Sequence, residues 1–166
     1  MKSSAAALLV AAALLLAAAL AGCGYRLAGA PALGEPIRVV VVTNDARLVR
    51  AQAALQRAVA EALQSRLGWQ VSPTGSAKLE LTIAQEKIDS TGTDRRDVPA
   101  RWSIRLQGKV LVAARDGTAY GDYHGTGYSS GLGDEPEAIN NAADEAAALI
   151  SAWLEHEVPK WKKPTP

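Results

Sequence analysis

The sequence is poor in the residues on which several kinds of chemistry depend. Its 166 residues include one cysteine, two histidines and no phenylalanine, and aromatic residues make up only 5%. With Cys23 alone, the chain offers no pair for an intramolecular disulfide, no cysteine-based metal cluster and no buried thiol nucleophile. Because aromatic residues are scarce, the core must consist mainly of valine, leucine, isoleucine and alanine.

The chain also lacks an excess of charge of either sign. It has 18 lysines and arginines against 17 aspartates and glutamates. A protein that binds polyanions in general, such as nucleic acid, needs a clear surplus of positive charge, so this class is not expected. The overall composition is that of an ordinary globular chain and not of a disordered one.

The first 22 residues are predicted to be a secretion signal. Lys2 is followed by an unbroken apolar run over residues 5–21, and the sequence Leu20-Ala21-Gly22-Cys23 comes directly after it. This junction resembles the bacterial lipobox, in which the peptidase cuts before the cysteine and Cys23 becomes a lipidated amino terminus. The alternative is an uncleaved transmembrane anchor, since the run reaches the lower end of the spanning length. Gly24, and not aspartate, follows Cys23, which by analogy with Gram-negative lipoproteins favours the outer membrane.

Hydrophobic periodicity predicts two long helices and four strands. We expect strands at 37–43, 78–87, 101–113 and 118–128, helices at 46–67 and 136–157, and a short strand at 69–72. Gly68 is expected to end the first helix, Asp134 to cap the start of the second, and Pro159 to end it. Residues 89–99 are expected to form a polar loop.

These elements predict an α+β fold, a mixed four-stranded sheet with two long helices packed on one face. The expected division is a signal peptide at 1–22, a lipidated linker at 23–36, a single domain at 37–158 and a flexible tail at 159–166. The residues expected in the core are Leu55, Val59, Leu63, Leu149, Ile150 and Trp153.

The sequence contains no recognisable catalytic constellation. His124 and His156 lack partners at metal-ligand spacing, and the glycine-rich stretch at 128–133 matches neither a hydrolase elbow nor a phosphate loop. Asp94 and Asp97 bracket two arginines and are interpreted as a salt-bridged turn and not as an acid/base pair. We therefore expect neither an enzyme nor a bound metal or cofactor.

Basic residues are concentrated between positions 85 and 115. Arg105 and Lys109 share one face of a predicted strand. A basic strip of this kind suits an anionic head group or the acidic wall of a partner. The alternative is a solvated sheet face with acidic neighbours. The candidate contact residues for lipopolysaccharide or a barrel are Lys87, Arg95, Arg96, Arg105 and Lys109.

The mature amino terminus, Cys23-Gly24-Tyr25-Arg26-Leu27-Ala28-Gly29, resembles that of the LPS-assembly lipoproteins, the LptE family. The expected order of strands and helices also resembles that family over nearly the whole mature chain. The resemblance implies an α+β protein without covalent chemistry. Such a protein sits in the barrel of the outer-membrane protein LptD, assists its assembly and contacts lipopolysaccharide during export.

The expected function is therefore that of an outer-membrane lipoprotein that partners an LptD-type barrel, with its domain in the periplasm or in the barrel lumen. Two other interpretations remain open. One is a periplasmic regulatory lipoprotein, such as an activator of a cell-wall synthase, and the other is a lipid-anchored hydrolase. The hydrolase would need a catalytic constellation.

Overall fold

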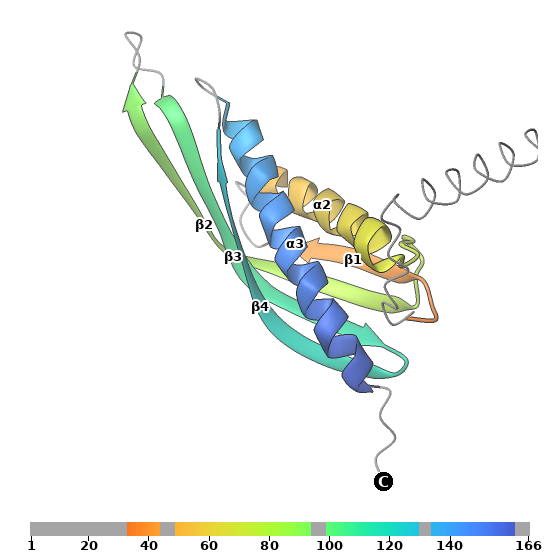
Figure 1. Ribbon diagram of the computed structural model, residues 1–166. Coiled ribbons are helices and arrows are strands. Elements are labelled where there is room, and N and C mark those ends of the chain that lie inside the picture. Colours follow the sequence, from red (N-terminus) through yellow and green to blue (C-terminus); the bar gives the residue numbers. More distant parts are fainter. Residues whose placement is uncertain (1–32, 44–48, 94–98, 130–133, 162–166) are drawn as a thin grey trace, which may run out of the picture.

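The computed structural model describes residues 33–43, 49–93, 99–129 and 134–161. Its elements are β1 (Ile37–Val42), α2 (Val49–Leu67), β2 (Ala77–Thr93), β3 (Pro99–Ala114), β4 (Gly117–Tyr128) and α3 (Glu135–Trp161). The four strands form one sheet in the order β1-β2-β3-β4, with β1 parallel to β2 and the other pairs antiparallel. The predicted α+β fold with a mixed four-stranded sheet is confirmed (Figure 1).

Both helices pack on the same face of the sheet, and their apolar stripes form the core. Leu55, Val59, Leu63 and Ile150 are buried as predicted. Arg57 of α2 donates to Asn140 Oδ1 of α3 at 2.9 Å, which joins the two helices at their exposed side. From the strands, the side chains that meet them are those of Ile37, Val39, Val41, Leu79, Leu81, Ile83, Ile104, Leu106, Val110 and Val112.

Two of the predicted core residues lie elsewhere. Leu149 is 41% exposed, so its assignment to the core is wrong, and Trp153 is only partly buried and packs against the edge of the core. The cause is the narrow apolar stripe of α3, whose fully buried face is made mostly of alanines. Leu149 and Trp153 lie on the flank of that stripe, beside β4.

The start and end of the helices follow local sequence signals. Asp134 Oδ1 accepts the backbone N–H of Glu137 at 3.1 Å, which is the predicted N-cap of α3. Gly68 has a φ of 65° and follows the last residue of α2, as expected for a glycine after a helix end. Contrary to the prediction, α3 does not stop before Pro159 but continues to Trp161. Proline in the last turn removes a single hydrogen bond, and the buried side chain of Val158 and the packing of Trp161 hold this turn against the core.

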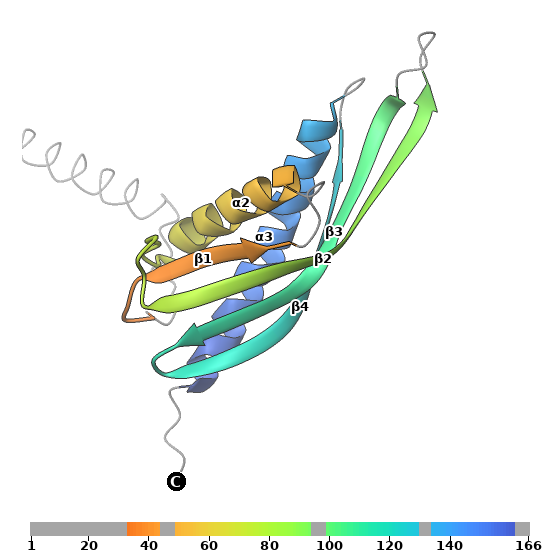
Figure 2. The same cartoon turned by 180° about the vertical axis from the view of Figure 1, so that it is seen from behind.

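Strands β2 and β3 are longer than predicted. The ladder continues through Ser90↔Trp102 and Thr91↔Arg101 to Thr93↔Pro99, so residues 89–93 are strand and not polar loop. Both views show the far ends of β2 and β3 projecting beyond β1 and α2 (Figures 1 and 2). The strand predicted at 69–72 is reduced to one parallel bridge, Ile37↔Val71.

Glycines on β4 let α3 approach the sheet closely. A Cβ atom at Gly125 would lie 2.1 Å from the carbonyl oxygen of Ala142, and one at Gly127 would lie 2.0 Å from that of Ala138. Alanine on the helix and glycine on the strand therefore bring the two backbones into direct contact. This contact fixes α3 over the upper part of β4.

The predicted signal peptide, Cys23, Arg95 and Arg96 lie outside the described residues. Among the helices that the structure describes, none has the length and apolar content needed to cross a bilayer.

Candidate functional site

The sheet face opposite the helices carries the described members of the basic strip. Arg105 and Lys109 alternate with the buried Ile104, Leu106 and Val110 of β3, so their side chains leave the sheet on its uncovered side. Lys87 lies on the same side because it is paired with Arg105. Lys87 and Arg105 are directly opposite each other in the β2–β3 ladder. The structure thus brings these two predicted residues together, while Arg95 and Arg96 are in the segment 94–98 that is not described.

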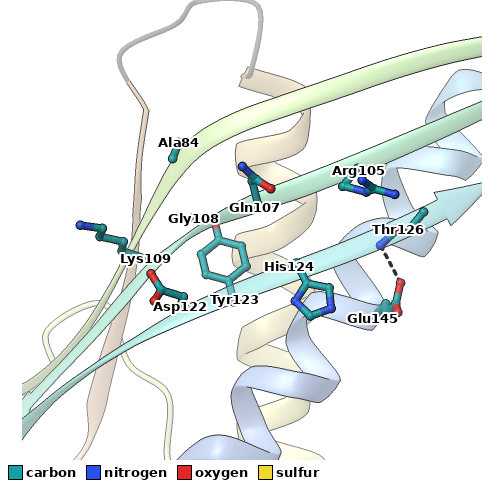
Figure 3. A pocket seen from close by; sticks show the side chains of 10 residues that line it. All are labelled: Ala84, Arg105, Gln107, Gly108, Lys109, Asp122, Tyr123, His124, Thr126 and Glu145. Atoms are coloured by element: carbon teal, nitrogen blue, oxygen red, sulfur yellow. Dashed lines mark hydrogen bonds between the residues drawn. The ribbon is translucent and has the colours of Figure 1, made fainter.

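An open groove of about 710 Å³ lies at the middle of this face. Figure 3 shows Arg105, Gln107 and Lys109 along β3, with Asp122, His124 and Thr126 along β4. The lining also includes Ala84 of β2, Gly108 of β3, Tyr123 of β4 and Glu145 of α3. Two of the five predicted contact residues, Arg105 and Lys109, are therefore groove residues.

A β-bulge creates the hollow. Ile83 pairs with Gly108 and Gln85 with Gln107, so Ala84 is the extra residue on β2. A Cβ atom at Gly108 would come within 1.8 Å of the Thr82 carbonyl oxygen, which makes glycine necessary at this position. The small residues Ala84 and Gly108 leave the space that longer side chains would fill.

Tyr123 closes the sheet behind the groove. Its side chain is almost fully buried, and its hydroxyl donates to the carbonyl oxygen of Thr82 at 3.4 Å, across Gly108. Burial raises the pKa of the Tyr123 hydroxyl far above its ordinary value, so this group stays neutral. A neutral phenol held in place in this way supports the sheet and does not act as a base.

Charges of both signs line the groove, and its two cations have no ion-pair partner among the described residues. Lys109 lies opposite Asp122 in the β3–β4 ladder, and Arg105 lies opposite Thr126. Glu145 is engaged by the backbone N–H of Thr126, which it accepts at 2.6 Å. Among the ion pairs formed by described residues, none involves Arg105 or Lys109, whereas Lys87 Nζ pairs with Asp89 Oδ2 at 2.9 Å. Lys87 is thus partly neutralised, and the positive charge available in the groove comes from β3.

Reasoning from the sequence missed the acidic and aromatic members of the groove. Alternation could have placed Asp122, His124 and Thr126 on one face of β4, but the register that sets Asp122 opposite Lys109 depends on the hairpin. Glu145 could not have been found, since it reaches the groove from a helix on the other side of the sheet.

The described residues offer no evident place for a metal ion. No three histidine, cysteine, aspartate or glutamate side chains of that part gather closely enough to hold one. His124 lies in the groove and His156 on the exposed side of α3, so the two histidines are on different layers.

No protein-family model matches the chain, and no curated protein matches it in sequence. Several solved structures are loosely similar in arrangement. A minor lipoprotein from Acinetobacter baumannii is 13% identical with a TM-score of 0.43, and the match covers 82% of this chain and 100% of that one. PelC from Paraburkholderia phytofirmans, solved as a dodecamer, is 16% identical with a TM-score of 0.45, over 75% and 88% of the two chains. Rare lipoprotein B from Shewanella oneidensis is 12% identical with a TM-score of 0.31, over 75% and 89%. Likeness at this level does not establish a shared function.

Proposed function

We propose that this protein is an outer-membrane lipoprotein that partners an LptD-type barrel in the assembly and export of lipopolysaccharide. In this proposal the protein is a binding partner and not an enzyme. Cys23 carries the lipid anchor, and the face of the sheet opposite the helices contacts the barrel or the lipopolysaccharide.

The observation that carries the proposal is the groove with Arg105 and Lys109 on the open sheet face. Both cations lie on one strand, both line the groove, and no described acidic side chain forms an ion pair with either. Guanidinium and ammonium groups placed in this way suit phosphate groups or the acidic wall of a protein. Further support comes from the lipobox-like junction that ends at Cys23 and from the mature amino-terminal sequence.

The test is charge reversal at the groove. Wild type and an Arg105→Glu/Lys109→Glu variant are purified from detergent-solubilised outer membranes, and the barrel protein and lipopolysaccharide that accompany each are measured. We expect the variant to lose at least about tenfold of the bound material, since two favourable contacts of about 1 kcal/mol or more become repulsive. Binding by wild type should also weaken as salt rises, because exposed charges are screened within about 8 Å at physiological ionic strength.

A matched control reverses two exposed arginines on the other layer of the molecule, Arg50→Glu/Arg66→Glu on α2. This variant has the same net charge as the groove variant and should retain both partners. Thermal melts of all three proteins establish that each is folded. Equal co-purification by wild type and the groove variant would rule out the groove as the contact surface.

A further inference from the structure

The sheet has two edges, and side chains close the β1 edge. Gln56 and Gln52 of α2 donate hydrogen bonds to the carbonyl oxygens of Val39 and Val41, at 3.2 and 2.8 Å. An edge strand with unbonded backbone groups is a template for another strand, and side chains that occupy those groups prevent such pairing. A strand that paired with β1 would have to displace both glutamines.

The upper part of the β4 edge is closed in the same way. Asn141 Nδ2 of α3 donates to the carbonyl oxygen of Tyr128 at 2.8 Å, and Glu145 accepts the backbone N–H of Thr126 at 2.6 Å. Alternate residues of a strand direct their backbone groups to the same side. The even-numbered residues of β4 therefore face the edge, and the odd-numbered residues face β3.

Below Thr126 the β4 edge is open (Figure 1). Its even-numbered residues there are Thr118, Tyr120, Asp122 and His124, and the described part of the chain provides no hydrogen bond to their backbone groups. Each of them presents one N–H and one C=O group. The segment 118–124 thus offers the hydrogen-bonding groups needed to add a strand of ordinary length.

On the inner face of the sheet, apolar side chains of α3 border the open edge. Leu149 follows Glu145 by one turn, has no group that could bond the edge, and is 41% exposed. Trp153 is one turn further and lies against Gly121, where an added Cβ atom would be 2.9 Å from the indole ring. Because paired residues share a face of the sheet, a residue added opposite Gly121 would lie next to Leu149 and Trp153. An apolar side chain suits this position.

The charge along the open edge is negative. Strand β4 contains Asp122 and neither lysine nor arginine. Helix α3, which runs beside it, carries acids but no lysine or arginine from Glu135 to Glu157. Lys109 lies opposite Asp122 on the β3 side, and the described ion pairs do not include this one. A basic side chain opposite Asp122 on the open side would complement this charge.

A second copy of the chain does not fit this edge. Helix α3 lies directly over β4, as the contacts at Gly125 and Gly127 with its backbone require. Antiparallel pairing of two β4 strands about 4.8 Å apart would bring two α3 helices closer than the roughly 8–10 Å at which helices pack. It would also bring two acidic helices together. An extended segment without a helix of its own avoids both conflicts.

We propose that the open edge at 118–124 binds an extended, basic segment of a partner protein, which adds to β4 as an antiparallel strand. Antiparallel pairing is slightly more stable per residue than parallel pairing. The main chain of the segment bonds the outward-facing groups of β4, and its side chains alternate between basic and apolar. A basic residue is opposite Asp122 on the outer face, and an apolar residue is opposite Gly121 on the inner face. The proposal does not depend on what the groove binds.

Hydrogen exchange of individual β4 amides tests the proposal with a synthetic peptide. The probe is a nine-residue peptide in which lysine and valine alternate, added at about 1 mM to the intact protein in detergent. The amides of Tyr120 and Asp122 should exchange fast in the protein alone and at least about threefold more slowly with the peptide. The odd-numbered β4 amides face β3 in both samples and serve as the internal reference.

Modified peptides separate main-chain pairing from charge. N-methylation of the lysines removes the N–H groups that would face β4, so it should abolish the slowing. N-methylation of the valines, whose N–H groups face away from β4, should retain it. A peptide with glutamate in place of lysine should bind at least about fivefold more weakly, because its carboxylates meet Asp122.

Two α3 variants test the apolar border of the edge. Leu149→Lys places a cation beside the open segment and should remove the effect of the peptide. Ala152→Lys makes the same change of net charge at an exposed position outside the stripe of Leu149 and Trp153, and it should retain the effect within about twofold. Thermal melts establish that both variants are folded.

Slow exchange at Tyr120 and Asp122 before the peptide is added would mean that the chain closes this edge itself, and it would overturn the proposal. The same holds for exchange that the peptide leaves unchanged, and for slowing that survives N-methylation of the lysines. Equal binding of the lysine and glutamate peptides, or equal effects of the two α3 variants, would also contradict it.

Discussion

Leu63 is completely buried in α2 at the centre of the core, with 0% of its side chain exposed. Its truncation removes apolar contacts and leaves a cavity that the rigid helix and sheet layers cannot fill. We therefore expect Leu63→Ala to lower the free energy of unfolding by about 2–5 kcal/mol. Denaturant unfolding followed by circular dichroism measures this change.

The control for this prediction lies on the same helix. Val49 is 57% exposed at the start of α2, so Val49→Ala should change the free energy of unfolding by no more than about 0.5 kcal/mol. A loss at Leu63 as small as that at Val49 would show that the packing between α2 and the sheet is loose.

Single residues also show where sequence reasoning reaches its limit. Leu63 and Leu149 both fit a helical apolar stripe, yet one is fully buried and the other is 41% exposed. Periodicity gives the direction of a side chain around its helix, but burial depends on how far the neighbouring strand extends beneath it. The side of α3 that carries Leu149 lies beside the last strand, and no further strand of the described chain covers it.

At the scale of the elements, the close contact between α3 and β4 depends on glycine. A Cβ atom at Gly125 would be 2.1 Å from the Ala142 carbonyl oxygen and 2.9 Å from the Ala146 side chain. Gly125→Ala should therefore push the helix away from the strand and lower the free energy of unfolding by about 1–3 kcal/mol. The measurement is again denaturant unfolding.

Thr126→Ala is the matched control for the glycine variant. Thr126 is the next residue on the strand, and its contact with Glu145 uses the backbone N–H, which alanine retains. Its cost should stay within about 1 kcal/mol, the range of strand propensities. Equal effects of the two substitutions would mean that α3 can move away from β4 without loss of packing.

The core elements were predictable because their sequences have clear periods. The β-branched run of β1, the alternation in β3 and the three-and-four spacing of α3 each specify one type of element. The end of β2 was not predictable, because residues 89–93 are polar and small and are held as a strand by pairing with β3. The end of α3 was missed because the packing of Val158 and Trp161 outweighs the single bond that Pro159 removes.

The candidate site was predictable only in part, because its shape depends on how the strands pair and not on the periodicity of one strand. Alternation placed Arg105 and Lys109 on one face of one strand. The hollow between them and β4 arises from a bulge at Ala84 and a glycine at position 108, and neither leaves a periodic signal. The groove is thus a property of the assembled sheet and not of any one strand.

At the scale of the whole molecule, one side of the sheet provides the packing that stabilises the fold, and the other side provides the proposed contact surface. The helices and the inner face of the sheet form the core, while the outer face carries the groove with Arg105 and Lys109. Changes on the outer face can therefore alter binding while the core stays intact. We expect the predicted lipid anchor at Cys23 to be dispensable for folding, because the core residues that the structure describes all lie at Leu33 or later.

The last prediction concerns this anchor. Cys23→Ser removes the thiol to which the lipid would be attached, and a few acyl chains, at about 0.8 kcal/mol per buried methylene, provide firm membrane attachment. We expect the variant to appear in the soluble fraction after cell lysis while wild type remains with the membranes. The two proteins should show the same thermal melting once wild type is extracted in detergent. Mass spectrometry of wild type should find an acylated chain that begins at Cys23, and an intact, unmodified leader at 1–22 would contradict the prediction.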